Sequence, residues 1–148
     1  QKLNKNLLLV YTGLKRTAHH IAKSYVNKLQ TSKKSHILEI SNFVEEGERI
    51  IRRGAIDEFG KLLHESWLEK KSLSSSITNL SIDHIYDKAL KKGALGGKLL
   101  GAGGGGFLIF YVPYYKQKNF IRYFKNLITV PFKFTSEGSK IMFKKFNK

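Results

Sequence analysis

The sequence predicts an α+β domain in which an antiparallel sheet of about four strands carries helices packed on one face. Two observations lead to this fold class. Apolar, β-rich runs stand near both ends of residues 7–112, and several consecutive segments with helical spacing separate them. No linker or internal repeat divides the 148 residues, so we expect a single domain over 1–148.

The first half of the chain predicts one strand and four helices. The run LLLVYT at 7–12, closed by Gly13, is typical of a buried strand. Apolar residues then recur at helical spacing in four segments: 17–29, 37–51, 56–67 and 82–90. Gly54 and Gly93 are expected to end the second and the fourth of these helices, and Ser81 to cap the start of the fourth.

The second half changes to short strands around a glycine-rich segment. Residues 94–100 are strand-like but interrupted by glycine, and 107–112 (FLIFYV) form a hydrophobic strand that Pro113 ends. A helix with one apolar side is expected over 115–127. Two more short strands are expected near the end of the chain, at 130–134 and 141–146.

Basic residues strongly outnumber acidic ones, with 27 Lys and Arg against 11 Asp and Glu, for a net charge of +16. A surface this positive attracts polyanions. The lysines are spread along the chain, however, and many lie on helices whose other faces are apolar. We therefore expect a solvated surface without a specific nucleic-acid role, and a sugar phosphate or a nucleotide as the better partner.

Several classes of protein are excluded by what the sequence lacks. Cysteine is absent, which excludes disulfides, thiolate metal sites and a cysteine nucleophile. The longest apolar run, 107–112, is far shorter than the ~20 residues that a membrane-spanning helix needs. The opening residues lack the apolar core of a signal peptide. We therefore expect a cytoplasmic protein with no membrane partner.

The segment GALGGKLLGAGGGG at 93–106 is the feature that points to chemistry. Glycine adopts positive φ and lets successive backbone amides approach an anion. A plain turn between two strands is the alternative interpretation. A hairpin needs only about two to five loop residues, however, and seldom contains two glycine clusters around a lysine. We therefore interpret this segment as a ligand-binding loop.

Three familiar glycine loops do not fit this segment. Gly101, Gly103 and Gly106 match G-x-G-x-x-G, but the dinucleotide fold requires a helix afterwards, where this chain has a strand. A Walker A loop requires Gly six residues before Lys98 and Ser or Thr after it, and this chain has Lys and Leu there. A protein kinase needs H-R-D and D-F-G motifs downstream, and neither follows.

A lysine, short apolar residues, Gly-Ala-Gly-Gly-Gly-Gly and a hydrophobic strand succeed one another over 98–110. This order resembles the third conserved motif of the GHMP kinases, a family of galacto-, homoserine, mevalonate and phosphomevalonate kinases. The resemblance implies a ferredoxin-like C-terminal domain whose loop closes the active site beside the transferred phosphoryl group. It implies phosphate- or nucleotide-binding roles for Lys98, Gly101, Ala102, Gly103, Gly104 and Gly105.

Residues 7–112 as a whole resemble the branch of this family that phosphorylates fucose and heptose 7-phosphate. The strand-then-helix segment of that branch resembles 8–13 with the following Arg16. The central helix of that branch and the loop after it resemble residues 64–74, followed by Ile-Thr at 77–78 and Ile-Asp at 82–83. The resemblance implies that substrate binding involves Thr12, Gly13, Arg16, His64, Lys71 and Ser74.

Plainer interpretations stay open for several of these side chains. Arg16, at the start of a helix, suits a phosphate and equally suits solvent. His64 and Trp67 fit the interior of the domain better than a sugar site. Lys70 and Lys71 either face the substrate or solvate the end of a helix.

The resemblance implies a kinase that phosphorylates the anomeric hydroxyl of D-glycero-D-manno-heptose 7-phosphate or a similar sugar. Its cofactors would be ATP and Mg²⁺, bound mainly by an N-terminal domain that holds a Gly-Ser-rich phosphate loop and the catalytic aspartate. No such loop occurs in this chain, so we expect no catalytic residue and no metal ligand here. We expect only the C-terminal half of a two-domain kinase, inactive alone.

Two other functions are compatible with the sequence. One is a stand-alone basic RNA-binding module that uses an exposed sheet and a glycine loop as KH domains do, and the other is a domain that senses sugar phosphate. Against RNA binding, Phe107, Phe110 and Tyr111 are expected to lie buried in one strand. That arrangement would leave no exposed aromatic platform for bases.

Overall fold

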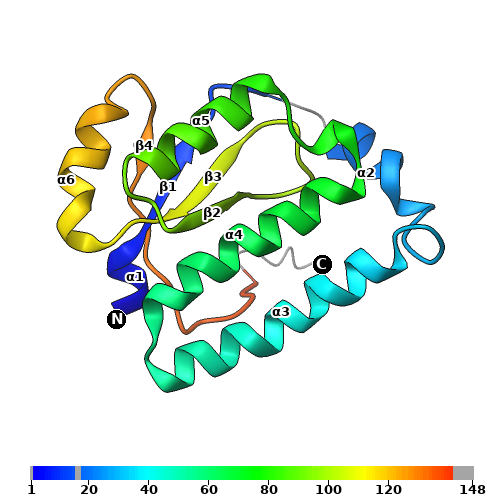
Figure 1. The fold of residues 1–148 in the computed structure, drawn as a ribbon, viewed down its shortest axis with the longest axis horizontal. Coiled ribbons are helices and arrows are strands. Elements are labelled where there is room, and N and C mark those ends of the chain that lie inside the picture. The colour runs from blue at the N-terminus through cyan, green and yellow to red at the C-terminus, as the bar shows by residue number, and fades with distance from the viewer. Residues whose placement is uncertain (1, 16–17, 142–148) are drawn as a thin grey trace, which may run out of the picture.

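A computed structural model describes residues 2–15 and 18–141 and confirms the α+β class (Figure 1). Its four-stranded antiparallel sheet has the order β2-β3-β1-β4. The strands are β1 (Leu7–Tyr11), β2 (Gly96–Leu99), β3 (Phe107–Tyr111) and β4 (Thr129–Val130). The two apolar runs at opposite ends of the sequence, β1 and β3, are therefore neighbours at the centre of the sheet.

Six α-helices are formed within the described residues. They are α1 (Lys2–Asn6), α2 (Ala18–Val26), α3 (Lys34–Arg53), α4 (Ile56–Leu73), α5 (Leu80–Lys91) and α6 (Tyr114–Tyr123), with a single 3-10 turn, η1 (Ser75–Ile77), after α4. In Figure 1, α4 and α5 cross in front of the strands and α3 lies outside α4. Within the described residues, no helix is long and apolar enough to cross a bilayer.

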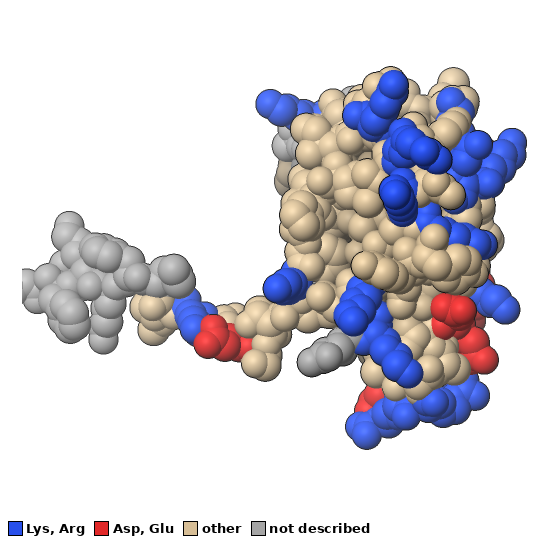
Figure 2. All heavy atoms as spheres, turned by 90° about the vertical axis from the view of Figure 1, so that its left-hand side faces the viewer, with Lys and Arg blue, Asp and Glu red and all other residues tan. Residues whose placement is uncertain are grey.

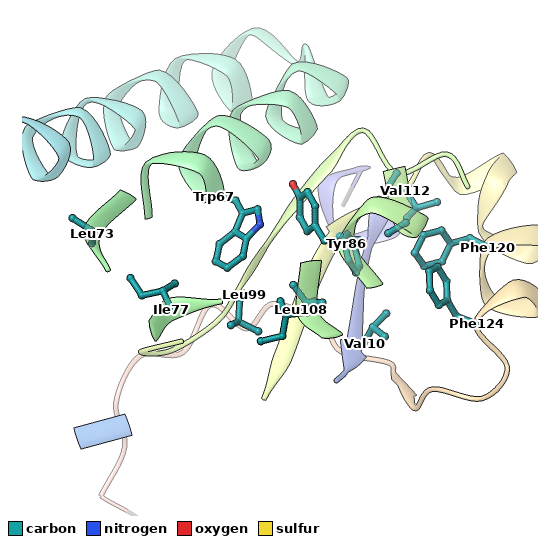
Figure 3. Close-up of a cluster of buried hydrophobic side chains, with 14 residues drawn as sticks. Val10, Trp67, Leu73, Ile77, Tyr86, Leu99, Leu108, Val112, Phe120 and Phe124 are labelled. Atoms are coloured by element: carbon teal, nitrogen blue, oxygen red, sulfur yellow. The ribbon is translucent and has the colours of Figure 1, made fainter. Parts of the chain in front are cut away.

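One face of the sheet supplies the floor of the hydrophobic core. Val10, Leu108 and Leu99 stand next to one another across three strands and are fully buried. Helices add the aromatic side chains above them, with Tyr86 between Trp67 and the rings of α6 (Figure 3). Each such side chain contributes roughly 1.5–3 kcal/mol when it leaves water. The expected place of Trp67 in the core is confirmed.

The tightest contact in the core joins α4 to the edge strand β2. A Cβ added at Gly96 would lie 2.0 Å from the carbonyl oxygen of Gly60, and one added at Gly60 would lie 2.9 Å from the ring of Tyr111. Real Cβ atoms do not approach other atoms so closely. Two glycines therefore let the backbone of α4 lie directly against the backbone of β2.

The structure contains one helix that the sequence did not predict and corrects one helix cap. The opening residues form the short helix α1, because Asn6 accepts a hydrogen bond from Tyr114 N–H and Gln117 donates to the carbonyl of Lys5. These partners lie far along the chain and leave no periodic signal. The start of α5 is capped by Asn79, whose Oδ1 accepts from Ile82 N–H at 3.1 Å, and not by Ser81.

Of the two strands expected at the end of the chain, the structure tests one and shows it to be shorter than predicted. The strand expected at 130–134 is only β4, because Pro131 has no N–H to continue the ladder beside β1. The strand expected at 141–146 begins at Ile141, which is not in a strand, and its other residues lie outside the described part. Phe107 is also less buried than expected, with 38 % of its surface exposed beside Tyr11.

A matched pair of glycine substitutions tests the α4–β2 contact. Gly60→Ala should lower the free energy of unfolding by roughly 1–3 kcal/mol, because its Cβ has no space. Gly47→Ala, inside α3, meets only ordinary contacts of 3.4 Å or more, and should raise stability by about 0.5–1 kcal/mol through helix propensity. Urea unfolding of both variants measures this. Equal effects would mean that the close approach does not exist.

Candidate functional site

The glycine loop at 101–106 joins β2 to β3 at one end of the sheet. Gly101, Gly103, Gly104 and Gly106 have φ values between 71° and 119°. Other residues adopt this region only with strain, so the repeated glycine is required by the shape of the backbone. The loop is a defined turn and not a flexible tether.

Three carbonyl oxygens of the loop accept hydrogen bonds from other parts of the protein. The carbonyl of Gly101 accepts from Lys70 Nζ at 2.5 Å. The carbonyl of Gly104 accepts from Asn79 Nδ2 at 3.4 Å, and that of Gly106 accepts from both the N–H and the hydroxyl of Thr12 at 2.9 Å. Donors from three separate elements therefore hold the loop at its start, middle and end.

The loop amides divide into two sets. The amides of Gly104 and Gly106 donate to the carbonyls of Ile77 at 2.7 Å and Leu14 at 3.0 Å. The amides of Gly101, Ala102, Gly103 and Gly105 have no hydrogen-bond acceptor among the described residues. In a trans peptide the C=O and the following N–H point in opposite directions. Holding the carbonyls of Gly101 and Gly104 therefore turns the amides of Ala102 and Gly105 away from the donors.

The loop also fits closely against its neighbours. A Cβ at Gly103 would lie 2.8 Å from the Cα of Ile77, and one at Gly105 would lie 2.6 Å from the carbonyl oxygen of Leu14. The segment after α4 and the turn after β1 therefore press on the loop from two sides. A side chain is excluded by space at both positions, and at Gly103 by its positive φ as well.

A hollow of about 240 Å³ opens beside the loop. It is lined by Ile21, Ser76, Thr78, Asn79 and Gly104. Complete sugar or nucleotide sites usually measure about 300–1,000 Å³, so the hollow has room for only part of such a ligand. The arrangement offers backbone amides, two hydroxyls and a carboxamide, which are groups that bind phosphate and sugar oxygens.

Several predicted substrate-binding residues lie around this loop. Thr12 is buried against Gly106, and Gly13 follows it at φ 77°. Ser74 bonds to Ser24 on α2 at 2.7 Å and caps η1, so it shapes the segment that lines the hollow. Arg16 lies outside the described residues.

Two other predicted residues have partners of their own. Lys71 lies 3.4 Å from the carboxylate of Asp83 and 5.6 Å from the centre of the Trp67 ring. His64 Nδ1 lies 2.8 Å from the hydroxyl of Tyr86, which itself donates to the carbonyl of Gly97. The hydroxyl oxygen must then accept from His64, which makes this histidine part of the packing between α4, α5 and β2.

Lys98 points away from the glycine loop. Side chains alternate along β2, and the ammonium of Lys98 donates to Ser66 Oγ on α4 at 2.7 Å. It borders an apolar groove between α3 and α4. Burial lowers the pKa of Lys98. The structure therefore does not bring its ammonium into contact with the loop that the sequence grouped it with.

Lys70 and Asn79 are the loop partners that the sequence did not reveal. Lys70 was considered only as a substrate-facing or solvated residue, and it instead holds two backbone carbonyls. Asn79 was overlooked in favour of Ser81 as a helix cap, and it both caps α5 and reaches Gly104. The sequence contained one signal for Asn79: asparagine is a preferred N-cap residue, and it stands just before the helical segment that became α5.

The site holds donors for an anion and no complete machinery for catalysis. Its unpaired amides form the kind of nest that binds phosphate oxygens. Among the described residues, no three His, Cys, Asp or Glu side chains are grouped so that they could hold a metal ion. The arrangement can therefore orient a phosphate and stabilise its charge, whereas a metal would need ligands from elsewhere.

Relatives with known names match most of the chain. A D-glycero-alpha-D-manno-heptose 7-phosphate kinase of Campylobacter jejuni is 30 % identical over 142 residues, which cover 94 % of this chain and 42 % of the relative. An L-fucokinase/L-fucose-1-P guanylyltransferase of Bacteroides fragilis is 36 % identical over 104 residues, 68 % of this chain and 11 % of the relative. The chain thus spans well under half the length of these relatives.

The fold has counterparts among solved kinases. The mevalonate kinase of Methanococcus jannaschii superposes with a TM-score of 0.71 at 25 % identity, over 88 % of this chain and 41 % of that one. The family model described as GHMP kinases C terminal matches residues 48–127, which include α4, α5, the glycine loop and α6. The chain therefore belongs to the GHMP kinase family and contains its C-terminal domain.

Proposed function

We propose that this chain is the substrate-binding and lid domain of an ATP-dependent sugar kinase. In this proposal the whole enzyme phosphorylates the anomeric hydroxyl of D-glycero-D-manno-heptose 7-phosphate or a similar sugar. The observation that supports it best is the glycine loop, in which protein donors hold three carbonyls and four amides have no acceptor among the described residues. Oriented amides of this kind stabilise charge on a phosphoryl group.

The relatives support a sugar as the substrate. Two of them are named as kinases of a heptose 7-phosphate and of L-fucose. The match to the heptose 7-phosphate kinase runs over 94 % of this chain and that to the fucokinase over 68 %. We choose the heptose phosphate because the longer match includes all parts of the site around the loop.

The roles of the residues follow from their positions. Loop amides, with Ser76 and Thr78 beside them, would hold phosphate or sugar oxygens. ATP and Mg²⁺ would be held mainly by an N-terminal domain of the same kinase. The amides of Gly101, Ala102, Gly103 and Gly105 would complete the phosphate site when the two domains meet. ATP supplies the phosphoryl group, and this domain supplies position and charge stabilisation. A cytoplasmic location, expected from the sequence, stays a prediction.

The substrate can be tested with the full-length protein. With ATP and Mg²⁺ we expect phosphorylation of D-glycero-D-manno-heptose 7-phosphate at the anomeric position, identified by ³¹P NMR. L-Fucose should react with a kcat/KM lower by roughly 100-fold or more, because buried groups that bind the 7-phosphate would lose their partner. A preference for fucose would change the sugar but keep the kinase. Turnover of neither sugar would contradict the proposal.

A loop variant tests the role of the backbone. Gly105→Ala places a Cβ 2.6 Å from the carbonyl of Leu14 without requiring a positive φ, so it should displace the Gly105 amide. We expect kcat of the full-length enzyme to fall by roughly 10²–10³, the loss typical for one misplaced donor. Gly138→Ala, where nothing lies within 4 Å, is the control and should keep its activity. Equal activity of the two variants would exclude the loop from the reaction.

One observation favours polyanion binding as a second function. Residues 88–136 contain no Asp or Glu, and the upper part of the face in Figure 2 shows blue side chains without red ones. Cations of α5 and α6 make no ion pair within the described residues: Lys88, Lys91, Lys92, Lys116, Lys118, Arg122 and Lys125. Exposed tyrosines stand among them, Tyr115 and Tyr123.

Salt dependence separates the two functions. As part of a sugar kinase, the full-length protein should bind a uridine oligonucleotide only weakly, with Kd of about 10⁻⁴ M or more at 0.15 M salt, measured by fluorescence anisotropy. A dedicated RNA-binding domain would bind far more tightly, and replacing Lys118, Arg122 and Lys125 with Gln would flatten its salt slope by about one unit per phosphate contact. Sub-micromolar binding at this salt would support the RNA-binding function.

A further inference from the structure

Lys70 occupies a particular position in the last turns of α4. Its half-buried side chain reaches the end of β2, where Nζ lies 2.8 Å from the carbonyl oxygen of Leu99 and 2.5 Å from that of Gly101. These two carbonyls flank Leu100, the residue at which the strand becomes the glycine loop. One ammonium therefore connects the rigid strand to the first turn of the loop.

No carboxylate in the described part of the chain neutralises the charge of Lys70. On the same helix, Glu69 pairs with His36, and Asp83 of α5 pairs with Lys71. The charged group that acts on Lys70 is Lys98, whose own ammonium is held by Ser66. An ammonium that donates to neutral carbonyls forms charge-assisted hydrogen bonds, which are roughly twice as strong as neutral ones.

The peptide between Gly101 and Ala102 connects Lys70 to ligand binding. Its carbonyl points at Lys70, so its N–H, that of Ala102, points the opposite way. That amide has no acceptor among the described residues. Without Lys70 this peptide could turn over, because glycine on one side permits either orientation, and the carbonyl would then face the ligand.

We propose that Lys70 is a positioning residue for the phosphate-binding loop. By holding the Gly101 carbonyl against α4, Lys70 aims the Ala102 amide at a bound anion. The proposal rests on the proposed function for its biological meaning, since the anion would be a phosphate of the kinase reaction. Lys70 acts through the backbone of the loop and is not itself placed against the reacting atoms.

The ionisation of Lys70 gives this role a pH signature. Burial, and then the like charge of Lys98, lower the pKa of Lys70 from 10.5 to about 8. Well below pH 8 Lys70 is an ammonium and holds the loop fully, and well above pH 8 it is a neutral amine that donates weaker hydrogen bonds. The effect on overall stability has the opposite sign. The folded state binds fewer protons here than the unfolded chain between pH 8 and 10.5, so this group adds stability as the pH rises through that range.

Four forms of the full-length protein test the proposal: wild type, Lys70→Met, Lys70→Arg and Lys61→Met. Lys61, exposed on the same helix, is the matched control. Sulfate is the probe because its charge is constant between pH 6 and 10, and its Kd is measured by NMR titration. The ¹⁵N shifts of Gly101 and Ala102 are followed against pH in the absence of sulfate.

We expect Lys70→Met to raise the Kd for sulfate about tenfold at pH 7, equal to about 1.4 kcal/mol. Lys70→Arg keeps the charge at every pH, so its Kd should stay within about threefold of wild type. The Gly101 and Ala102 signals should titrate near pH 8 in wild type and Lys61→Met, and in neither Lys70 variant. In the kinase assay, Lys70→Met should lower kcat while the KM for the sugar stays unchanged.

Either of two results would overturn the proposal: sulfate affinity of Lys70→Met equal to that of Lys61→Met, or loop signals in wild type that do not change between pH 7 and 9. If Lys70→Met does not fold, the wild-type pH profile and the rescue by Lys70→Arg decide. The sulfate and NMR measurements need no sugar and no turnover. The protein could phosphorylate neither sugar and still give the expected sulfate and NMR results. That outcome would contradict the proposed function and keep the role of Lys70.

Discussion

The arrangement of the site depends on the close approach of α4 to β2. At Gly60 and Gly96 the two backbones nearly touch, and this fixes the position of the helix along the strand. Successive turns of α4 then meet successive residues of β2. Ser66 reaches Lys98, and Lys70 reaches Leu99 and the first residue of the glycine loop. A side chain at either glycine would move every later contact, including the one that holds the loop.

A loop held by its carbonyls is a simple means of building an anion site. Hydrogen-bond donors on α4, on the segment before α5 and after β1 take up the negative ends of three loop peptides. Because each peptide is planar, the positive ends at Ala102 and Gly105 are left to face a ligand. Phosphoryl transfer needs position and charge stabilisation more than covalent chemistry from the protein. Oriented backbone amides are suited to stabilising the charge of a phosphoryl group.

The sequence predicted those parts of the fold and site that local patterns determine. Periodicity located α3, α4 and α5, and the glycine run located the loop, because each signal lies within a few residues. The partners of the loop were not predictable in this way. Lys70 and Gly101 are 31 residues apart, and only the α4–β2 contact brings them together.

The sequence grouped Lys98 with the loop because the two are near in sequence, whereas the alternation of side chains along β2 turns Lys98 toward Ser66. Helix α1 likewise depends on contacts with α6.

Lys70 and Lys98 are half-buried and have no acidic partner among the residues that the structure describes. Lys70 and Lys98 lose hydration on burial, and a carboxylate beside them would recover part of that loss. It would also place a negative charge next to amides that are to bind a phosphate. Neutral acceptors, which here are two carbonyls and a hydroxyl, compensate the ammonium groups without cancelling their field. The pKa of Lys70 is lowered because no carboxylate among the described residues offsets its loss of hydration and the like charge of Lys98.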